Sequence, residues 1–310
     1  MRKRSSTKIV SGAFIAVGIF VISLIIGISP VARAAQSTVN LGTAAPFAIL
    51  AGTPNITDAG NTSVITGNVG LSPATGAGIG LLCSQVTGTI YSVDAAGPLP
   101  CRITNGPLMV TAKNDLDTAY IDAAGRTPLT TVPTELGGTT LVAGVYNSVS
   151  TTFGITAGAG ALTLNGQGDP SSVFIFQAPF SGNGLTVGDG STVALINGAQ
   201  ACNVFWRVDT ASVGTTANFV GTILALNSIT ATNGATISGR LLARNGNVTL
   251  INDTITTPTC AGSGSSNNTV PGLPNTGLFG NQSLLWAIIP PTIVLTILLL
   301  VYIGRRKHLI

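Results

Sequence analysis

Few residues in this chain of 310 could carry acid–base or nucleophilic chemistry. The only histidine, His308, stands two residues from the C-terminus, and Glu135 is the only glutamate. A Ser-His-Asp or Cys-His centre therefore cannot be built from the body of the chain. Glycosidase chemistry needs a pair of carboxyl groups and would have to draw on the aspartates.

Three aspartates recur at intervals of 20 residues, at Asp169, Asp189 and Asp209. On a repeating fold they could form a column, so a polysaccharide-cleaving enzyme is one alternative. Each stands in a turn-like context, where an aspartate commonly accepts local backbone N–H groups. No glycine-rich stretch has the lysine or the strand–helix setting of a phosphate loop. We therefore expect no enzyme, no cofactor and no metal.

The N-terminal 34 residues have the features of a secretory signal peptide. Four basic residues lie between positions 2 and 8, an apolar run covers 10–28, and Ala32-Arg33-Ala34 offers a small-x-small cleavage site. The apolar run is longer than usual, so an uncleaved membrane anchor is the alternative.

The C-terminus predicts attachment to a cell surface. Within a predicted transmembrane segment at 278–304, about 20 residues (284–303) carry no charge, and a basic tail at 305–310 follows and should stay cytoplasmic. Upstream, Leu273-Pro274-Asn275-Thr276-Gly277 resembles the cell-wall sorting signal of Gram-positive-type surface proteins. That resemblance implies that a sortase cuts after Thr276 and joins the chain to peptidoglycan, after a stage in the membrane. A plain membrane anchor is the alternative.

The charges and the cysteines limit what the part of the chain between these ends can bind. Charged residues make up 8% of the chain, and the basic ones concentrate at the termini, which argues against a nucleic-acid binder. An even number of cysteines in an exported chain predicts disulfides. Of three pairings we favour Cys83–Cys101, which would staple a Gly/Pro-rich loop, and Cys202–Cys260, which would tie back the last strands. Zinc binding is disfavoured because there is no C-x-x-C spacing.

The working domain is expected at residues 35–260, followed by a flexible linker at 261–272. Short alternating runs rich in Thr, Val and Ile, separated by Gly/Asn turns, predict strands. Residues 219–225 match 237–243 at a spacing of 18, and Ile255 follows Ile237 by another 18. This repeat predicts one turn of a β-solenoid, with a Greek-key sandwich as the alternative. Residues 107–124 have helical apolar spacing, and Gly125 should end that helix.

These stretches together resemble the ice-binding-protein-like family. The matching residues are 40–44, 47–51, 65–73, 115–120, 122–126, 141–146, 173–177, 203–206 and 239–246. The resemblance implies a mainly β fold, a discontinuous right-handed β-solenoid (β-helix) with one long α-helix packed alongside and a capping region, to which the Cys83–Cys101 loop would belong. It also implies adsorption to an ice crystal surface, without catalysis.

The family's ice-binding face carries motifs of the type Thr-Ala/Gly-x-Thr/Asn, and four segments here end comparably. If Val193, Phe219, Ile237 and Ile255 point inward, the residue before each points outward. The implied ice-binding residues are Thr192, Thr215, Thr216, Asn218, Asn233, Thr236, Asn252 and Thr254. Gly190, Thr216, Gly234 and Asn252 should form a neighbouring column.

Two features weigh against this face. Asp189 and Asp253 should put charge on it or beside it, and charge prefers bulk water. A rival face carries Ser212, Ser228, Thr230, Asn247 and Thr249 around inward Val213, Ile229 and Val248. The alternative function is a non-catalytic adhesin or structural stalk that binds a glycan or another surface.

Overall fold

The computed structural model describes residues 36–178 and 184–261. The predicted signal peptide, sorting motif, transmembrane segment and basic tail lie outside these residues, as does the linker after Ala261. Among the described residues, the only α-helix, α2 (Gly106–Gly125), does not have the length and apolar character needed to cross a membrane.

The described strands stack as three-sided coils, and every pairing between them is parallel. This excludes the Greek-key alternative and confirms a solenoid. Sheet A contains β1 (Phe47–Ala51), β3 (Val64–Thr66), β4 (Asn68–Leu71), β6 (Val86–Thr87), β7 (Ile90–Ser92), β8 (Arg102–Thr104), β9 (Leu129–Val132), β11 (Gly144–Ser148), β14 (Phe174–Gln177), β17 (Val204–Val208), β19 (Asn218–Ala225), β21 (Thr236–Ala243) and β23 (Thr254–Thr256).

The other two sheets complete the coils. Sheet B contains β2 (Ile56–Asp58), β5 (Ile79–Gly80), β12 (Phe153–Ile155), β15 (Leu185–Val187), β18 (Ala211–Val213), β20 (Ile229–Ala231) and β22 (Val248–Leu250). Sheet C contains β10 (Thr140–Val142), β13 (Leu162–Asn165) and β16 (Val193–Ile196), and the first halves of β19 and β21 continue this third side. Short 3-10 turns are η1 (Gly42–Ala44), η2 (Gly76–Gly78), η3 (Cys83–Gln85), η4 (Ala157–Ala159) and η5 (Ala201–Asn203).

The 18-residue repeat is one complete coil. Phe219 pairs with Ile237, and Ile237 pairs with Ile255, so the repeat places equivalent residues on adjacent rungs. Each of these side chains is buried. The repeat therefore produces a continuous inner stack, as predicted.

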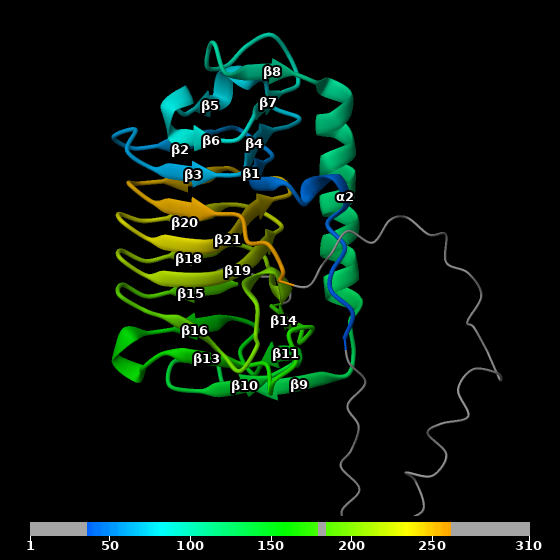
Figure 1. The fold of residues 1–310 in the computed structure, drawn as a ribbon, viewed down its shortest axis with the longest axis vertical. Coiled ribbons are helices and arrows are strands. Elements are labelled where there is room, and N and C mark those ends of the chain that lie inside the picture. The colour runs from blue at the N-terminus through cyan, green and yellow to red at the C-terminus, as the bar shows by residue number, and fades with distance from the viewer. Residues whose placement is uncertain (1–35, 179–183, 262–310) are drawn as a thin grey trace, which may run out of the picture. The chain divides into compact units, whose positions relative to one another are not determined.

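The order of the coils in space differs from their order in the chain. Strands β1 to β8 form one end of the solenoid, and α2 then runs back along it to the other end, where β9 resumes the stack (Figure 1). The later coils climb until β21, β22 and β23 pair with β1, β2 and β3. We call this junction the seam.

Helix α2 forms because one face of it is apolar and its start is capped. The Asn105 side chain accepts the Leu108 N–H, which satisfies a helix N-terminal donor. The buried residues of α2 are Met109, Ala112, Leu116, Ala119, Tyr120 and Ala123, and they pack against sheet A residues such as Phe205 and Leu242. The predicted helix at 107–124 is confirmed to within one residue at each end.

The interior is filled by apolar side chains that repeat from rung to rung. The rings of Phe176 and Trp206 stack with centroids 3.9 Å apart, and Phe153 and Phe219 pack around them. The disulfides Cys83–Cys101 and Cys202–Cys260 form as predicted, the first of them in the cap beside β8.

A buried polar network joins the two parts of the chain at the seam. The Asp253 backbone N–H donates to Ser63 Oγ at 2.9 Å, and Ser63 Oγ donates to Asp58 Oδ1 at 2.8 Å. Asp253 is 1% exposed, and its carboxylate accepts the N–H groups of Ala235 and Ile251. Burial raises the pKa of Asp253 to about 6, and the Asp58 carboxylate adds to this rise.

The raised pKa of Asp253 makes the seam sensitive to pH. In the folded protein this carboxyl group holds its proton more tightly than in the unfolded chain, so its contribution to the unfolding free energy falls as pH rises toward about 6. Asp253→Asn removes the titration. Relative to this variant, we expect the wild-type unfolding free energy to increase by about 2 kcal/mol between about pH 7.5 and about pH 4.

Chemical denaturation of both proteins across this range tests the prediction. Asp189→Asn removes an exposed carboxylate at a corner and is the control. Its unfolding free energy should not show the pH-dependent difference from the wild type that is expected for Asp253→Asn. A constant difference between wild type and Asp253→Asn would show that the buried carboxyl group does not titrate in this range.

Candidate functional site

The column expected from the sequence exists. Thr192 pairs with Asn218, Asn218 with Thr236, and Thr236 with Thr254, and all four are partly or fully exposed. The residues that follow them, Val193, Phe219, Ile237 and Ile255, are buried as expected. Beyond Thr254 the column continues to the exposed Val64, so its hydroxyl and amide character ends at the seam.

The neighbouring column marks a corner of the coil. Gly190, Thr216, Gly234 and Asn252 all have positive φ, between 55° and 81° where the chain turns from sheet B toward the third side. Glycine and asparagine are the residues that adopt this conformation most readily. The Gly/Asn content of this column therefore follows from the turn. The expected residues Thr215, Thr216, Asn233 and Asn252 lie on this corner between two faces.

The two aspartates near this corner differ in their placement. Asp189 is exposed, and its Oδ1 accepts the Thr215 N–H at 2.7 Å. Asp253 lies beneath the surface, where its carboxylate accepts hydrogen bonds from backbone N–H groups inside the seam. The expectation that Asp253 puts charge on the face or beside it is wrong, because its side chain is buried beneath the face.

Sheet B presents a second and longer column. The central residues of five successive strands, Thr186, Ser212, Thr230, Thr249 and Thr57, pair in one register without a shift. Their flanking residues on each strand are buried, so these five side chains point outward. Gly154 and Gly80 continue the column at its two ends. We call the five residues the sheet B hydroxyl column.

Hydrogen bonds between and within rungs hold part of this column in place. Between rungs, Thr57 Oγ1 donates to Thr249 Oγ1 at 3.4 Å, and within one rung Asn247 Nδ2 donates to Thr249 Oγ1 at 2.9 Å. Ser228 Oγ donates to Asn247 Oδ1 at 2.6 Å. Adjacent strands lie about 4.7–4.9 Å apart, so the hydroxyl groups stand at a regular separation on a surface that backbone pairing makes rigid.

No charged residue projects from the centre of any described sheet B strand. The described basic residues are Arg102, Lys113, Arg126, Arg207, Arg240 and Arg244, and they lie in α2, in sheet A or directly after them. Asp58, the last residue of β2, is turned into the seam network. The five side chains of the column are therefore uncharged hydroxyl groups, and the charged residue in register with them, Glu135, pairs with Gly154 beyond the end of the column.

Two members of this column, Thr57 and Thr186, belong to neither of the two faces expected from the sequence. Thr186 stands between the apolar residues Leu185 and Val187, the same three-residue pattern that surrounds Thr230 and Thr249, and that pattern could have identified Thr186 as outward. Thr57 is followed by Asp58, so the apolar pattern is incomplete there. What the local pattern could not reveal is that Thr57 neighbours Thr249, which is 192 residues away in the chain.

The three regularly spaced aspartates do not form a site. Asp169 lies between sheet C and sheet A, Asp189 between sheet B and sheet C, and Asp209 between sheet A and sheet B. The interval of 20 residues therefore distributes them over three corners. Each is engaged nearby: Asp169 with Ser171, Asp189 with Thr215, and Asp209 with Asn227. The carboxylate column required for the polysaccharide-cleaving alternative is not formed.

The described ranges also contain no group of three or more His, Cys, Asp or Glu side chains that could hold a metal ion. All four cysteines are used in the two disulfides.

Comparisons with known proteins agree with this architecture. A family model described as "Ice-binding-like" matches residues 49–256. An ice-binding protein of Colwellia sp is 44% identical over 233 residues, which cover 74% of this chain and 87% of that protein. An ice-binding protein of Flavobacterium frigoris is also 44% identical, over 224 residues that cover 71% of this chain and 76% of that protein.

Solved structures are similar over the same part of the chain. An ice-binding protein from an Antarctic biological consortium superposes with a TM-score of 0.61 at 36% identity, covering 75% of this chain and 96% of that one. A domain of Shewanella frigidimarina ice-binding protein 1 gives a TM-score of 0.64 at 30% identity, covering 73% and 99%. The family match and the curated relatives together show that this chain belongs to the ice-binding-like family.

Proposed function

We propose that this protein adsorbs to ice through the sheet B hydroxyl column and hinders the growth or recrystallisation of ice. The observation that carries the proposal is the row of five uncharged, outward Thr and Ser side chains that pair in continuous register on sheet B. Membership of the ice-binding-like family supports the same partner.

The chemistry of the column suits an ordered water surface. Each threonine offers a hydroxyl group that can donate and accept and a methyl group around which water can be caged. Because the rungs are fixed by backbone pairing before contact, little conformational entropy is lost on binding. No single contact is strong, and adsorption results from many weak ones acting on one rigid surface. This mode of action uses no cofactor.

Sheet B is a better candidate than the column of Thr192, Asn218, Thr236 and Thr254. The sheet B hydroxyl column crosses the seam without interruption, whereas the other column reaches Val64 there. The corner residues beside the second column have types that the left-handed turn itself demands. We therefore treat that column as the second candidate face, with Thr215, Thr216, Asn233 and Asn252 on its border with sheet B.

A matched pair of substitutions separates the two faces. Thr230→Tyr places a bulky ring in the middle of the sheet B hydroxyl column, and Thr236→Tyr does the same on the second candidate face. Both side chains point outward, so neither substitution should change the unfolding free energy by more than about 0.5–1 kcal/mol. We expect Thr230→Tyr to lose most of its uptake into a growing ice hemisphere and Thr236→Tyr to retain it.

The reverse pattern would assign ice binding to the second candidate face. Exclusion of the folded wild-type protein from the ice would contradict ice binding altogether, and would favour the adhesin or stalk alternative. Circular dichroism of each variant before the measurement checks that the solenoid is intact.

We also propose that the protein is exported and held at the cell surface. The support is the order of sequence features: an N-terminal signal-like segment, the Leu273–Gly277 motif, an apolar run and a basic tail. A sortase would join Thr276 to peptidoglycan, and the attached domain would hold the cell at ice or shield its surface.

Attachment is tested by releasing the protein from cells. We expect a peptidoglycan hydrolase to release a chain that begins at Ala35 and ends at Thr276 bonded to a wall fragment, as read by mass spectrometry. Leu273→Ala with Pro274→Ala should abolish this product. Release of the wild-type protein by detergent alone would instead indicate a membrane anchor.

A further inference from the structure

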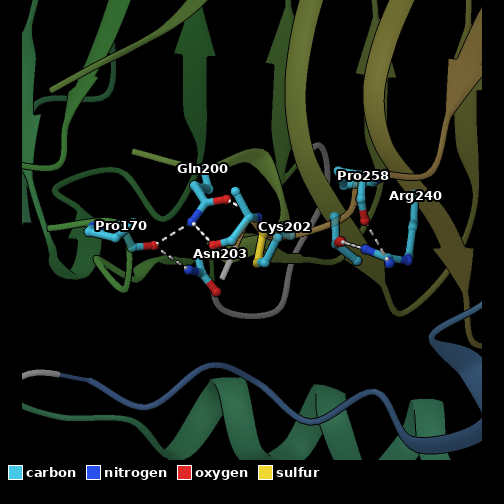
Figure 2. The surroundings of a disulfide bond; sticks show 9 residues. Pro170, Gln200, Cys202, Asn203, Arg240 and Pro258 are labelled. Atoms are coloured by element: carbon cyan, nitrogen blue, oxygen red, sulfur yellow. Dashed lines mark hydrogen bonds between the residues drawn. A yellow bond between two sulfur atoms is a disulfide. The ribbon is translucent and has the colours of Figure 1, made fainter. Parts of the chain in front are cut away.

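The last described residues are fastened to the body of the solenoid at several points beyond β23. The Thr257 N–H donates to the Thr66 carbonyl at 3.0 Å, and Arg240 donates to the Pro258 carbonyl at 3.3 Å. Cys260 is bonded to Cys202 (Figure 2). The Ala261 N–H then donates to Gln200 Oε1 at 2.6 Å, and Gln200 Nε2 returns a bond to the Ala261 carbonyl.

This path leads from the seam to the middle of the stack. Strand β23 belongs to the seam, where it pairs with β21 and β3. Cys202 belongs to η5, which leads into β17, and β17 lies between β14 and β19 in sheet A. The disulfide therefore links the end of the domain to a coil well inside the solenoid.

The residues on both sides of Cys202 are bonded to the preceding coil. Gln200 Nε2 and Asn203 Nδ2 both donate to the Pro170 carbonyl of the preceding coil, at 2.8 Å and 3.3 Å (Figure 2). Behind them, Trp206 of β17 is fully buried against Phe176. η5 is thus continuous with a strand whose aromatic side chain is packed in the core.

Without the disulfide, only the hydrogen bonds to Gln200 and Arg240 would resist tension applied after Ala261 before it reached β23. That strand has only three residues, and tension along the chain would load its bonds in sequence from Thr257 backward. Removing β23 would expose Ile255 and pull Asp253 from the seam network.

We propose that the Cys202–Cys260 disulfide is a mechanical lock, which transfers tension from the C-terminal attachment to the β17 coil and keeps the seam unloaded. This inference rests on the proposed attachment of the C-terminus to the cell surface. Tension then enters through covalent bonds at Cys202, and β23 is bypassed.

The position of the lock also leaves the proposed ice face free. Because η5 stands between β16 of sheet C and β17 of sheet A, it occupies the corner of the coil that does not border sheet B. A cell attached through this corner pulls from the side away from the sheet B hydroxyl column, which is the arrangement that suits adhesion to ice.

Detachment of cells under flow tests the lock in the full chain. Cells displaying the wild-type chain are compared with cells displaying Cys202→Ser/Cys260→Ser, and the matched control is Cys83→Ser/Cys101→Ser, which removes the cap disulfide. Cells are held either on ice or on a surface coated with an antibody against the folded domain. The antibody surface reports the strength of the lock even if the domain does not bind ice.

We expect cells that display any of the three proteins to be captured equally well without flow. Cells that display Cys202→Ser/Cys260→Ser should detach at several-fold lower shear than wild-type cells, because the rate of forced unfolding is set by the barrier along the pulled path. The cap variant should resist flow like the wild type. A reducing agent added to already displayed wild-type chains should reproduce the loss, which covers the case in which the double variant folds poorly.

Equal resistance of the wild-type, Cys202→Ser/Cys260→Ser and reduced wild-type cells on the antibody surface would overturn the proposal. A failure of ice capture alone, with the difference retained on the antibody surface, would instead count against the proposed ice binding and leave the lock supported.

Discussion

The parallel pairing of one rung with the next is the constraint from which the rest of this structure follows. Since side chains alternate across a strand, one register decides which residues are buried and which are presented to solvent. The apolar residues of successive rungs fill the interior, and Thr and Ser occupy the outward position of five sheet B strands. A shift by one residue would turn the hydroxyl groups inward, so the surface and the core are specified together.

The seam is where this constraint is hardest to satisfy, because the paired strands come from distant parts of the chain. Helix α2 makes the arrangement possible by carrying the chain from one end of the stack to the other. The buried network of Asp58, Ser63 and Asp253 then fixes the register of β2 and β3 against β22 and β23. A buried carboxylate is costly unless hydrogen-bonded, and here both oxygens of Asp253 accept backbone N–H groups. The network thus keeps Thr57 beside Thr249 and the sheet B hydroxyl column continuous.

Local periodicity predicts the solenoid and the helix, because each is set by residues close in sequence or repeated at one spacing. The outward column at Thr192, Asn218, Thr236 and Thr254 follows from the motif that the family resemblance implies, together with the alternation of side chains along a strand. The disulfide pairing was also correct. The contribution of Thr57 and the burial of Asp253 could not be predicted, because both depend on the pairing of β2 and β3 with coils some 190 residues later. The backbone role of Gly and Asn at the left-handed corner has the same kind of origin, because they satisfy a turn whose position only the assembled coil reveals. The regular aspartates show the converse, since a constant interval on coils of unequal length places them on different corners.

The central claim is that ice contacts the sheet B hydroxyl column. Solid-state NMR of the isotope-labelled protein in frozen solution can measure magnetisation transfer from ice protons to individual side chains. If sheet B is the contact surface, transfer should be strongest at Thr57, Ser212, Thr230 and Thr249 and weak on α2. Strongest transfer at Thr236 and Thr254, or equal transfer over all faces, would contradict it.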